Sequence, residues 1–434
     1  MDNKIYIICF VNFYTLYFKI ERTNRGDNKS MMYDIVIVGA GPAGSTAAKI
    51  LASQDLNVLL IDKEKFPRNK PCGGGLPIRS LKRFPYIKDI NVIESYSYGG
   101  YLYPPSLCNN IEIIKQEPVI AMVLRKKFDN ALVKLAIDNG AKFLDGKSVT
   151  DLKITLDKAQ ITLDDGREIQ TDLVIGADGF LSTIAQKAGL ATRHRNKGIS
   201  VVEEFSLKKD TMDQFYTNKR LCHIHSKIHG ISGYGWVFPK QSHVNIGLAK
   251  YLTNGNSVND KKNIREEFKE YLTLLRNTDI IPKNIESTQL RGGTLQVKPL
   301  EKTYADRIIL CGDAAGLINP VSGEGIYYAL ASGEIAARVA SESIKKDDSS
   351  EQFLSRYEQQ WKNDFGQEIK LMLKSTKQWG KQNENIFKLM SKDNKLAEMF
   401  LSIITGQESV YELRWKILKR YIYAYMKYSL RIKQ

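Results

Sequence analysis

A glycine-rich turn between two buried strands is the feature that most constrains the fold of this chain. The run Tyr33–Val38 is continuous and β-branched, and a second apolar run spans Asn57–Asp62. Strands that are apolar on both faces are typical of a parallel sheet covered by helices. Small residues between the runs predict a helix over Ser45–Ser53, which completes a βαβ unit. The sequence therefore predicts an α/β fold.

The turn after the first run carries the spacing Gly39-x-Gly41-x-x-Gly44. The first glycine of such a turn allows a tight bend, the second lets the backbone approach a diphosphate, and the third lets helix and strand pack closely. The helix N-terminus then presents N–H groups to phosphate oxygens. Asp62 ends the second strand, where an acid accepts a hydrogen bond from an adenosine ribose. We expect a dinucleotide cofactor held by Gly39, Gly41, Pro42, Ala43, Gly44 and Asp62.

Two later buried runs also end in glycine and aspartate. Leu173–Gly176 leads to Asp178-Gly179, and Ile308–Leu310 leads to Gly312-Asp313-Ala-Ala-Gly316. Singly, either pattern could be a strand exit with an N-capping aspartate. In this order, and with the glycine fingerprint, the three motifs resemble the FAD-binding pattern of the flavoprotein hydroxylase superfamily.

This resemblance implies a glutathione-reductase-like FAD domain and several contacts to FAD. Arg125 and Asp129, in the pattern Arg-x-x-x-Phe-Asp, match the start of a helix near the cofactor. In the superfamily, the loop corresponding to Pro320–Gly325 passes the pyrimidine edge of the flavin. The residues implied to bind FAD, beyond the fingerprint and Asp62, are Arg125, Asp178, Gly179, Asp313, Gly316, Gly323 and Gly325. The superfamily usually has a basic residue where Ala185 stands, so no nicotinamide contact is inferred there.

Two further motifs narrow the resemblance. Lys70-Pro-Cys-Gly-Gly-Gly-Leu76 follows the second strand, and Tyr234-x-Trp-x-Phe-Pro239 is followed after seven residues by Gly247. Both are similar to signatures of the geranylgeranyl reductase family, whose members saturate isoprenoid double bonds. The resemblance covers about residues 33–340. It implies an FAD-dependent reductase that adds hydride from reduced FAD, and a proton, to the double bonds of a geranylgeranyl-type chain, with a membrane-lipid precursor as the expected substrate.

The residues of these two motifs suggest their roles. Successive glycines leave a backbone that can lie against a flat ring, so we expect Cys72, Gly73 and Gly74 to form the active-site loop, with Cys72 and Gly73 also contacting FAD. Glycine-rich, apolar surroundings favour a thiol that shapes this loop over a nucleophilic thiolate. Tyr234, Trp236 and Phe238 share one strand face, which is either core or a ligand pocket. With Pro239 and Gly247, we expect them to bind the lipid. No residue identifies itself as the proton donor.

The motifs and the pattern between them predict a domain division. Residues 198–250 alternate as in an antiparallel sheet, and the chain from Ser349 onward is helical. We expect an antiparallel-sheet substrate domain beside the FAD domain, and a C-terminal helical segment. The predicted parts are an extension over 1–30, the FAD domain over 31–95, 118–180 and 300–345, the substrate domain over 96–117 and 181–299, and helices over 346–434.

Charge and composition indicate the partners. The net charge is +16, and Glu412–Gln434 holds seven basic residues and one acid. The same tail can place Trp415, Leu418, Ile422, Tyr425 and Met426 on one helical stripe, which is either a packed face or an interfacial one. No apolar run reaches 18 residues, and no nucleic-acid motif occurs. Five cysteines without a CxxC pair fit a reducing compartment. We expect a cytoplasmic, peripherally membrane-associated protein that binds no nucleic acid.

Several alternatives stay open. A flavin-dependent monooxygenase or halogenase could use the same FAD domain with oxygen, and a lipid-binding flavoprotein could use it without turnover. The single fingerprint leaves the external electron donor open between NAD(P)H, ferredoxin and another donor. His223 and His225 share a strand face without a further ligand at a suitable interval, so no metal site is expected. Residues 1–30 are interpreted as an extension outside the core, from an upstream start, or as a weak interfacial anchor.

Overall fold

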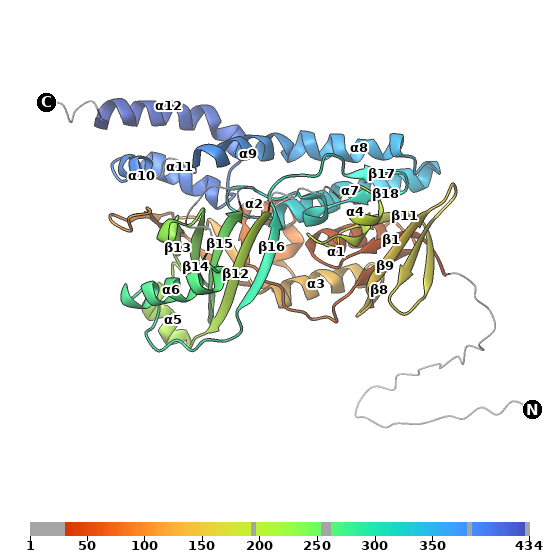
Figure 1. Ribbon diagram of the computed structural model, residues 1–434, viewed down its shortest axis with the longest axis horizontal. Helices are drawn as coiled ribbons and strands as arrows, with labels where there is room; N and C mark the ends of the chain where they lie inside the picture. Colours follow the sequence, from red (N-terminus) through yellow and green to blue (C-terminus); the bar gives the residue numbers. More distant parts are fainter. Residues whose placement is uncertain (1–30, 192–196, 253–261, 380–383, 430–434) are drawn as a thin grey trace, which may run out of the picture.

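The computed structural model describes residues 31–191, 197–252, 262–379 and 384–429. A mostly parallel sheet with its helices forms one end of an elongated molecule, an antiparallel sheet forms the other end, and the C-terminal helices run along one side (Figure 1). This arrangement confirms the predicted α/β FAD-binding fold with a second antiparallel sheet and C-terminal helices. The predicted N-terminal extension, residues 1–30, lies outside the described residues.

The first sheet is built around β1 (Met31–Val38). It pairs in parallel with β2 (Val58–Asp62) on one side and with β11 (Glu168–Gly176) on the other, and β18 (Ile308–Leu310) pairs in parallel with β11. The carboxyl ends of these four strands therefore meet at one edge. The other strands of the sheet are β8 (Lys142–Asp145), β9 (Val149–Ile154), β10 (Ala159–Leu163) and β17 (Tyr304–Ala305).

Three helices pack together around the first turn: α1 (Pro42–Ala52), α3 (Arg125–Asp138) and α7 (Ile326–Lys346). Helix α1 begins three residues before the predicted start, since the proline at its first position has a φ suited to a helix and no N–H that needs a partner. A Cβ on Gly333 of α7 would lie 2.3 Å from the carbonyl oxygen of Ala43. Only glycine therefore allows this close approach of α7 to α1.

The second sheet has the order β16-β12-β15-β14-β13-β5-β6 and is antiparallel except for the pair β13–β5. Helix α6 (Ile264–Asn277) packs on one face, where Val237 shares a core with Phe268 and Tyr271, and α5 (Lys209–Tyr216) contributes Met212 to that core. Trp236, the neighbour of Val237, points to the other face. The strands are β5 (Gly99–Tyr103), β6 (Ile111–Ile114), β12 (Lys197–Ser206), β13 (Cys222–Ser226), β14 (Gly233–Pro239), β15 (His243–Leu252) and β16 (Arg291–Gln296).

A small third sheet takes its strands from the part of the chain between β2 and β8. It consists of β3 (Gly75–Pro77), β7 (Ile120–Val123) and β4 (Ile93–Ser97), and α2 (Ile78–Arg83) follows β3 directly. One predicted boundary is wrong. The prediction assigned residues from 181 onward to the second sheet, but α4 (Thr183–Lys187) buries Ile184 and Ala185 in the core of the first. A Cβ on Gly176 would lie 3.0 Å from Ile184, so this glycine makes room for the helix.

The C-terminal segment is helical, as predicted. Helix α8 (Glu351–Trp361) continues through one π-helical turn, Lys362–Gly366, into α9 (Gln367–Trp379). Helices α10 (Glu384–Met390), α11 (Asn394–Ile404) and α12 (Val410–Ser429) follow, and α12 forms the outermost layer over them (Figure 1). Within the described ranges, no helix has the length and hydropathy needed to cross a bilayer.

Candidate active site

The three fingerprint glycines meet different demands at the edge of the first sheet. A Cβ on Gly39, where φ is 103°, would lie 2.3 Å from the carbonyl oxygen of Ala177, and one on Gly44 would lie 1.9 Å from the carbonyl oxygen of Gly39. A Cβ on Gly41 would meet only the guanidinium of Arg68, at 3.8 Å. Gly39 and Gly44 are therefore fixed by packing, whereas the backbone at Gly41 is open to a diphosphate.

Asp62 holds the fingerprint turn in place. Its Oδ2 accepts a hydrogen bond from the backbone N–H of Ala40 at 2.8 Å, and its Oδ1 accepts one from Glu64 at 2.9 Å. Each carboxylate oxygen has two lone pairs, so these bonds still leave acceptor capacity for a hydroxyl group. The contact of Asp62 with an adenosine ribose stays a prediction.

Asp178 and Asp313 lie at the ends of the neighbouring strands. Asp178 Oδ2 accepts hydrogen bonds from the backbone N–H groups of Thr183 at 2.7 Å and Ile184 at 3.2 Å, so this carboxylate caps α4. Its Oδ1 is buried and has no hydrogen-bond partner among the described residues, and burial raises the pKa of Asp178. Asp313 Oδ1 lies 3.4 Å from the place where a Cβ on Gly325 would be. A donor from a bound cofactor would satisfy the orphaned oxygen of Asp178.

Three cations gather around one buried acid beside this edge. Asp129 accepts two hydrogen bonds of 2.8 Å from Arg125 and one of 2.9 Å from Arg68. Burial opposes the charge of Asp129, but Arg125 and Arg68 lower its pKa. Lys70 is an exposed residue. Desolvation by the surrounding protein nevertheless lowers its pKa, while the negative charge of Asp313 acts to raise it. The surplus of positive charge suits a diphosphate.

The sequence predicted a role for only one of these cations, Arg125. Arg68 lies in the polar loop after β2, where no spacing marks it, and Lys70 opens the motif that ends at Leu76 but was assigned no role. Together, the open backbone at Gly41, the orphaned oxygen of Asp178 and the three cations fit a cofactor that carries a diphosphate and hydroxyl groups, as FAD does. The predicted contacts of Gly179 and Gly316 stay predictions. Both adopt a positive φ, at 83° and 71°, in the turns after β11 and β18.

The loop Cys72–Gly75 lies directly against the second sheet. A Cβ on Gly73 would lie 2.9 Å from the ring of Phe238. Gly74 adopts a φ of 72°, and a Cβ on it would lie 2.1 Å from the carbonyl oxygen of Val123. The backbone N–H of Gly74 donates to Cys72 Sγ at 3.4 Å. The loop therefore has the nearly bare backbone that the sequence predicted. Its close contacts with Phe238 and Val123 require glycine at positions 73 and 74.

The surroundings of Cys72 are less apolar than the sequence indicated. The guanidinium of Arg125 lies close to its thiol. Burial opposes the charge of Arg125, while Asp129 and Cys72 raise its pKa. Because Arg125 begins α3 more than 50 residues downstream, the glycine-rich sequence around Cys72 gave no sign of this cation.

A buried polar network fixes the loop to the second sheet. Trp236 Nε1 donates to Asn245 Oδ1 at 2.8 Å, and Asn245 Nδ2 donates to the carbonyl oxygen of Cys72 at 3.1 Å and to Glu204 Oε2 at 2.8 Å. Lys240, 1% exposed, donates to the same Glu204 oxygen at 2.9 Å. Sequence reasoning missed Asn245, Glu204 and Lys240, since their partners come from distant segments.

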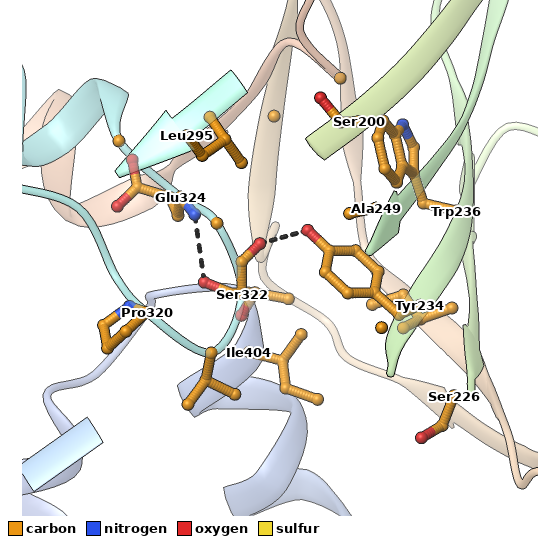
Figure 2. Close-up of a pocket in the computed structure, with 18 of the residues that line it drawn as sticks. Ser200, Ser226, Tyr234, Trp236, Ala249, Leu295, Pro320, Ser322, Glu324 and Ile404 are labelled. Carbon is orange, nitrogen blue, oxygen red and sulfur yellow. Dashed lines mark hydrogen bonds between the residues drawn. The ribbon is translucent and has the colours of Figure 1, made fainter. Parts of the chain in front are cut away.

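An apolar cavity of about 550 Å³ opens between these elements. Figure 2 shows Tyr234 and Trp236 on one side and Pro320, Ser322 and Glu324 on the other, with Ile404 reaching in from α11. The volume lies within the range of ligand sites. The cavity is also lined by the loop Cys72–Gly75 and, from the C-terminal segment, by Leu373, Phe387, Phe400 and Thr405.

The aromatic stripe of β14 lies on one face, as predicted. The ring centroids of Tyr234 and Trp236 are 5.7 Å apart, and those of Trp236 and Phe238 are 6.2 Å apart. All three residues line the cavity. Two residues predicted to bind the lipid with them do not line it. Gly247 pairs with Trp236 in the adjacent strand, where a Cβ would lie 2.0 Å from the indole, and Pro239 accepts a hydrogen bond from Ser95 at 3.1 Å.

The loop Pro320–Gly325 is tied to the second sheet just before α7. Tyr234 donates its hydroxyl hydrogen to the carbonyl oxygen of Ser322 (Figure 2). Gly323, at φ 67°, would place a Cβ 3.3 Å from that hydroxyl oxygen. Glu324 Oε1 accepts a hydrogen bond from the backbone N–H of Tyr327 at 2.8 Å, and burial raises the pKa of Glu324 to about 7. The N-terminal end of α7 thereby faces the cavity, with Gly323 and Gly325 beside it.

The two histidines of β13 are buried, and each is hydrogen-bonded to a tyrosine. His223 Nδ1 lies 2.9 Å from the hydroxyl oxygen of Tyr103, and His225 Nδ1 lies 2.9 Å from that of Tyr271. Burial lowers the pKa of His223 to about 3, so its ring is neutral at physiological pH.

The comparisons with known proteins agree with this geometry. An FAD-binding domain family model matches residues 32–363. The chain is 35% identical over 328 residues to an uncharacterized protein of Methanosarcina barkeri (75% of this chain, 78% of the relative). It is 32% identical over 344 residues to a digeranylgeranylglycerophospholipid reductase of Methanocaldococcus jannaschii (76% of this chain, 82% of the relative).

Two solved structures share the fold of this chain. A geranylgeranyl bacteriochlorophyll reductase-like protein of Thermoplasma acidophilum superposes with a TM-score of 0.75 at 26% identity, covering 93% of this chain and 98% of its own. A flavin-dependent brominase, at 19% identity, shares the fold with a TM-score of 0.68, covering 90% of this chain and 99% of its own. The chain is thus an FAD-dependent oxidoreductase that belongs to the geranylgeranyl reductase family.

Proposed function

We propose that this protein saturates carbon–carbon double bonds in a geranylgeranyl-type isoprenoid chain, as part of a membrane-lipid precursor. One observation carries the proposal: the apolar cavity is walled by an aromatic strand face on one side and by the loop Cys72–Gly75, which has almost no side chains, on another. A flexible hydrocarbon chain needs such apolar walls, and a flat ring needs a backbone without Cβ atoms to approach. The names of the archaeal relatives support the same class of substrate.

FAD, when bound and reduced, supplies hydride. The residues of this chain orient the double bond and keep water out. Tyr234, Trp236 and Phe238 offer a continuous aromatic surface against which an isoprenoid chain can lie. The start of α7 lines the same space, where the positive end of the helix dipole would stabilise negative charge that develops on a reduced ring. An unactivated alkene is a poor hydride acceptor, so a proton must reach its other carbon.

The test is an anaerobic incubation of the purified holoenzyme with a chemical reductant and a geranylgeranyl glycerolipid. The proposal predicts that mass spectrometry shows the gain of two hydrogens for each bond reduced. Heat-inactivated enzyme and a fully saturated lipid serve as controls. An unchanged lipid without oxygen, together with hydroxylated or halogenated products in its presence, would instead assign the protein to the monooxygenases or halogenases.

A further inference from the structure

Helix α12 carries an apolar stripe that faces solvent. Trp415, Leu418, Ile422, Tyr425 and Met426 follow one another at intervals that keep them on one side of a helix, and each is between 46% and 61% exposed. Of the 13 large hydrophobic residues that are exposed in the described ranges, seven lie on this one helix. Contiguous exposed apolar surface of this kind marks an interaction site.

The opposite face of α12 holds it to the protein. Ala424 is fully buried, in one cluster with Leu389 and Leu401 of α10 and α11. Arg420 forms a salt bridge of 2.8 Å with Asp393, which caps the N-terminus of α11. Because the helix is fixed on this side, the exposed stripe is a stable surface feature.

Basic side chains accompany the stripe. Helix α12 contains five basic residues and one acid, Glu412. Lys416, Lys419 and Lys427 are exposed. Lysines can extend past an apolar face to reach lipid headgroups, and each basic residue near an anionic bilayer contributes about 1 kcal/mol of attraction. An apolar stripe with Trp and Tyr beside Lys and Arg is the pattern of a helix that lies in a membrane interface.

The helix that carries the stripe packs on two helices that line the apolar cavity. Phe387 of α10 and Phe400 and Ile404 of α11 line the cavity, and these two helices lie under α12 (Figure 1). Phe238 packs against the cluster that buries Ala424. A single apolar core thus connects the substrate face of β14 with the helix that carries the stripe.

We propose that α12 docks on an anionic bilayer with Trp415, Leu418, Ile422, Tyr425 and Met426 inserted among the lipids, so that a lipid tail reaches the cavity past α10 and α11. The route of the tail rests on the proposed function, whereas the docking itself does not. The alternative partner for an exposed apolar face is a second copy of this chain. Charge favours the bilayer, because two copies would bring their basic side chains close together and these would repel each other.

The test is co-sedimentation of the FAD-loaded protein with phosphatidylcholine vesicles that contain phosphatidylglycerol. We expect binding that weakens in pure phosphatidylcholine and in high salt. Replacing Trp415, Ile422 and Met426 by serine should weaken binding at least about tenfold. The matched control replaces the exposed Leu156 and Leu181 by serine and should bind as the wild type does. Equal binding by the triple variant, or no binding by the wild type, would overturn the proposal.

Two further measurements separate the remaining outcomes. Lipids brominated on their tails should quench tryptophan fluorescence in the wild type, and Trp415→Phe should lose this quenching while its FAD absorbance stays unchanged. Detergent-dispersed lipid substrate should be reduced equally by the triple variant and the wild type. If neither turns over substrate while vesicle binding follows the prediction, the proposed function fails and the docking stands. A wild-type dimer that the triple variant converts to a monomer, without vesicle binding, would assign the stripe to self-association instead.

Discussion

The indole Nε1 of Trp236 and the side-chain oxygen of Asn245 are joined by a buried hydrogen bond of 2.8 Å. Through the amide nitrogen of Asn245, the same side chain holds the backbone of Cys72. The aromatic face that we expect to bind the lipid and the loop that we expect to face the flavin are therefore positioned by one asparagine. Neither element can shift without breaking a buried polar contact.

Asn245→Ala should lower the free energy of unfolding by about 1–3 kcal/mol, because it leaves the indole N–H without a buried partner and removes one of the two donors to Glu204. Urea unfolding of the holoenzyme measures the change. The control is Asn57→Ala, whose side chain is exposed and donates to the carbonyl oxygen of Met32. If the free energy of unfolding falls by the same small amount in both variants, the network does not hold the loop.

Gly247→Ala should disturb the aromatic face of β14 through Trp236. The new Cβ would lie 2.0 Å from the indole, and the forced shift should cost about 1–3 kcal/mol. Trp236→Leu removes the clash, so the double variant should lose less than the sum of the single variants in a double-mutant cycle. Gly292→Ala is the control in the same sheet, where the nearest atom is 3.7 Å away. Strict additivity would mean that Gly247 does not act by making room for the indole.

Gly74→Ala should be more damaging than the same change at Gly166. Both glycines have a positive φ, 72° and 81°, which costs an alanine about 1–2 kcal/mol. At Gly166 nothing lies within 4 Å, whereas at Gly74 the new Cβ would lie 2.1 Å from the carbonyl oxygen of Val123. We expect Gly74→Ala to weaken FAD retention in gel filtration and Gly166→Ala to leave it unchanged. Equal retention by both would contradict the assignment of the loop.

Glu324 should make stability depend on pH. Burial raises its pKa from the usual 4.5 to about 7 in the folded protein. The folded state therefore binds this proton more tightly than the unfolded chain does, and the resulting stability, present below about pH 4.5, is lost as pH rises through 7. Glu324→Gln keeps an acceptor for the N–H of Tyr327, and relative to the wild type it should gain about 1–3 kcal/mol between pH 5 and pH 8.

Thermal or urea unfolding at the two pH values measures this difference. The exposed Glu301, replaced by Gln, is the control and should follow the wild type. If Glu324→Gln gains no more stability than the Glu301 control between pH 5 and pH 8, the pKa of Glu324 is not raised in the folded protein.

The parts of the site that the sequence predicted are those with a local pattern. A β-branched run, a glycine spacing and an alternating aromatic stripe are each set by neighbouring residues, so β1, the turn at Gly39 and the shared face of Tyr234 and Trp236 follow from them. The stripe of α12 is of the same kind: helical spacing placed its members on one side, and only the structure shows that this side is exposed.

The parts that were missed depend on contacts between distant segments. Asn245 is an unremarkable polar residue of an antiparallel strand until Trp236 and Cys72 lie beside it. The cation next to Cys72 comes from the start of α3. The role of Gly247 also depends on register: the signature spacing was visible, but its reason, room for an indole on the paired strand, required the pairing of β14 with β15.

The most direct test of the central claim follows the flavin itself during one turnover. The holoenzyme is reduced without oxygen, freed of excess reductant and mixed with a geranylgeranyl lipid in a stopped-flow spectrometer. The account predicts that the absorbance of oxidised flavin returns, with one double bond saturated for each flavin reoxidised. A flavin that stays reduced with the lipid present, and is reoxidised only when oxygen is admitted, would contradict it.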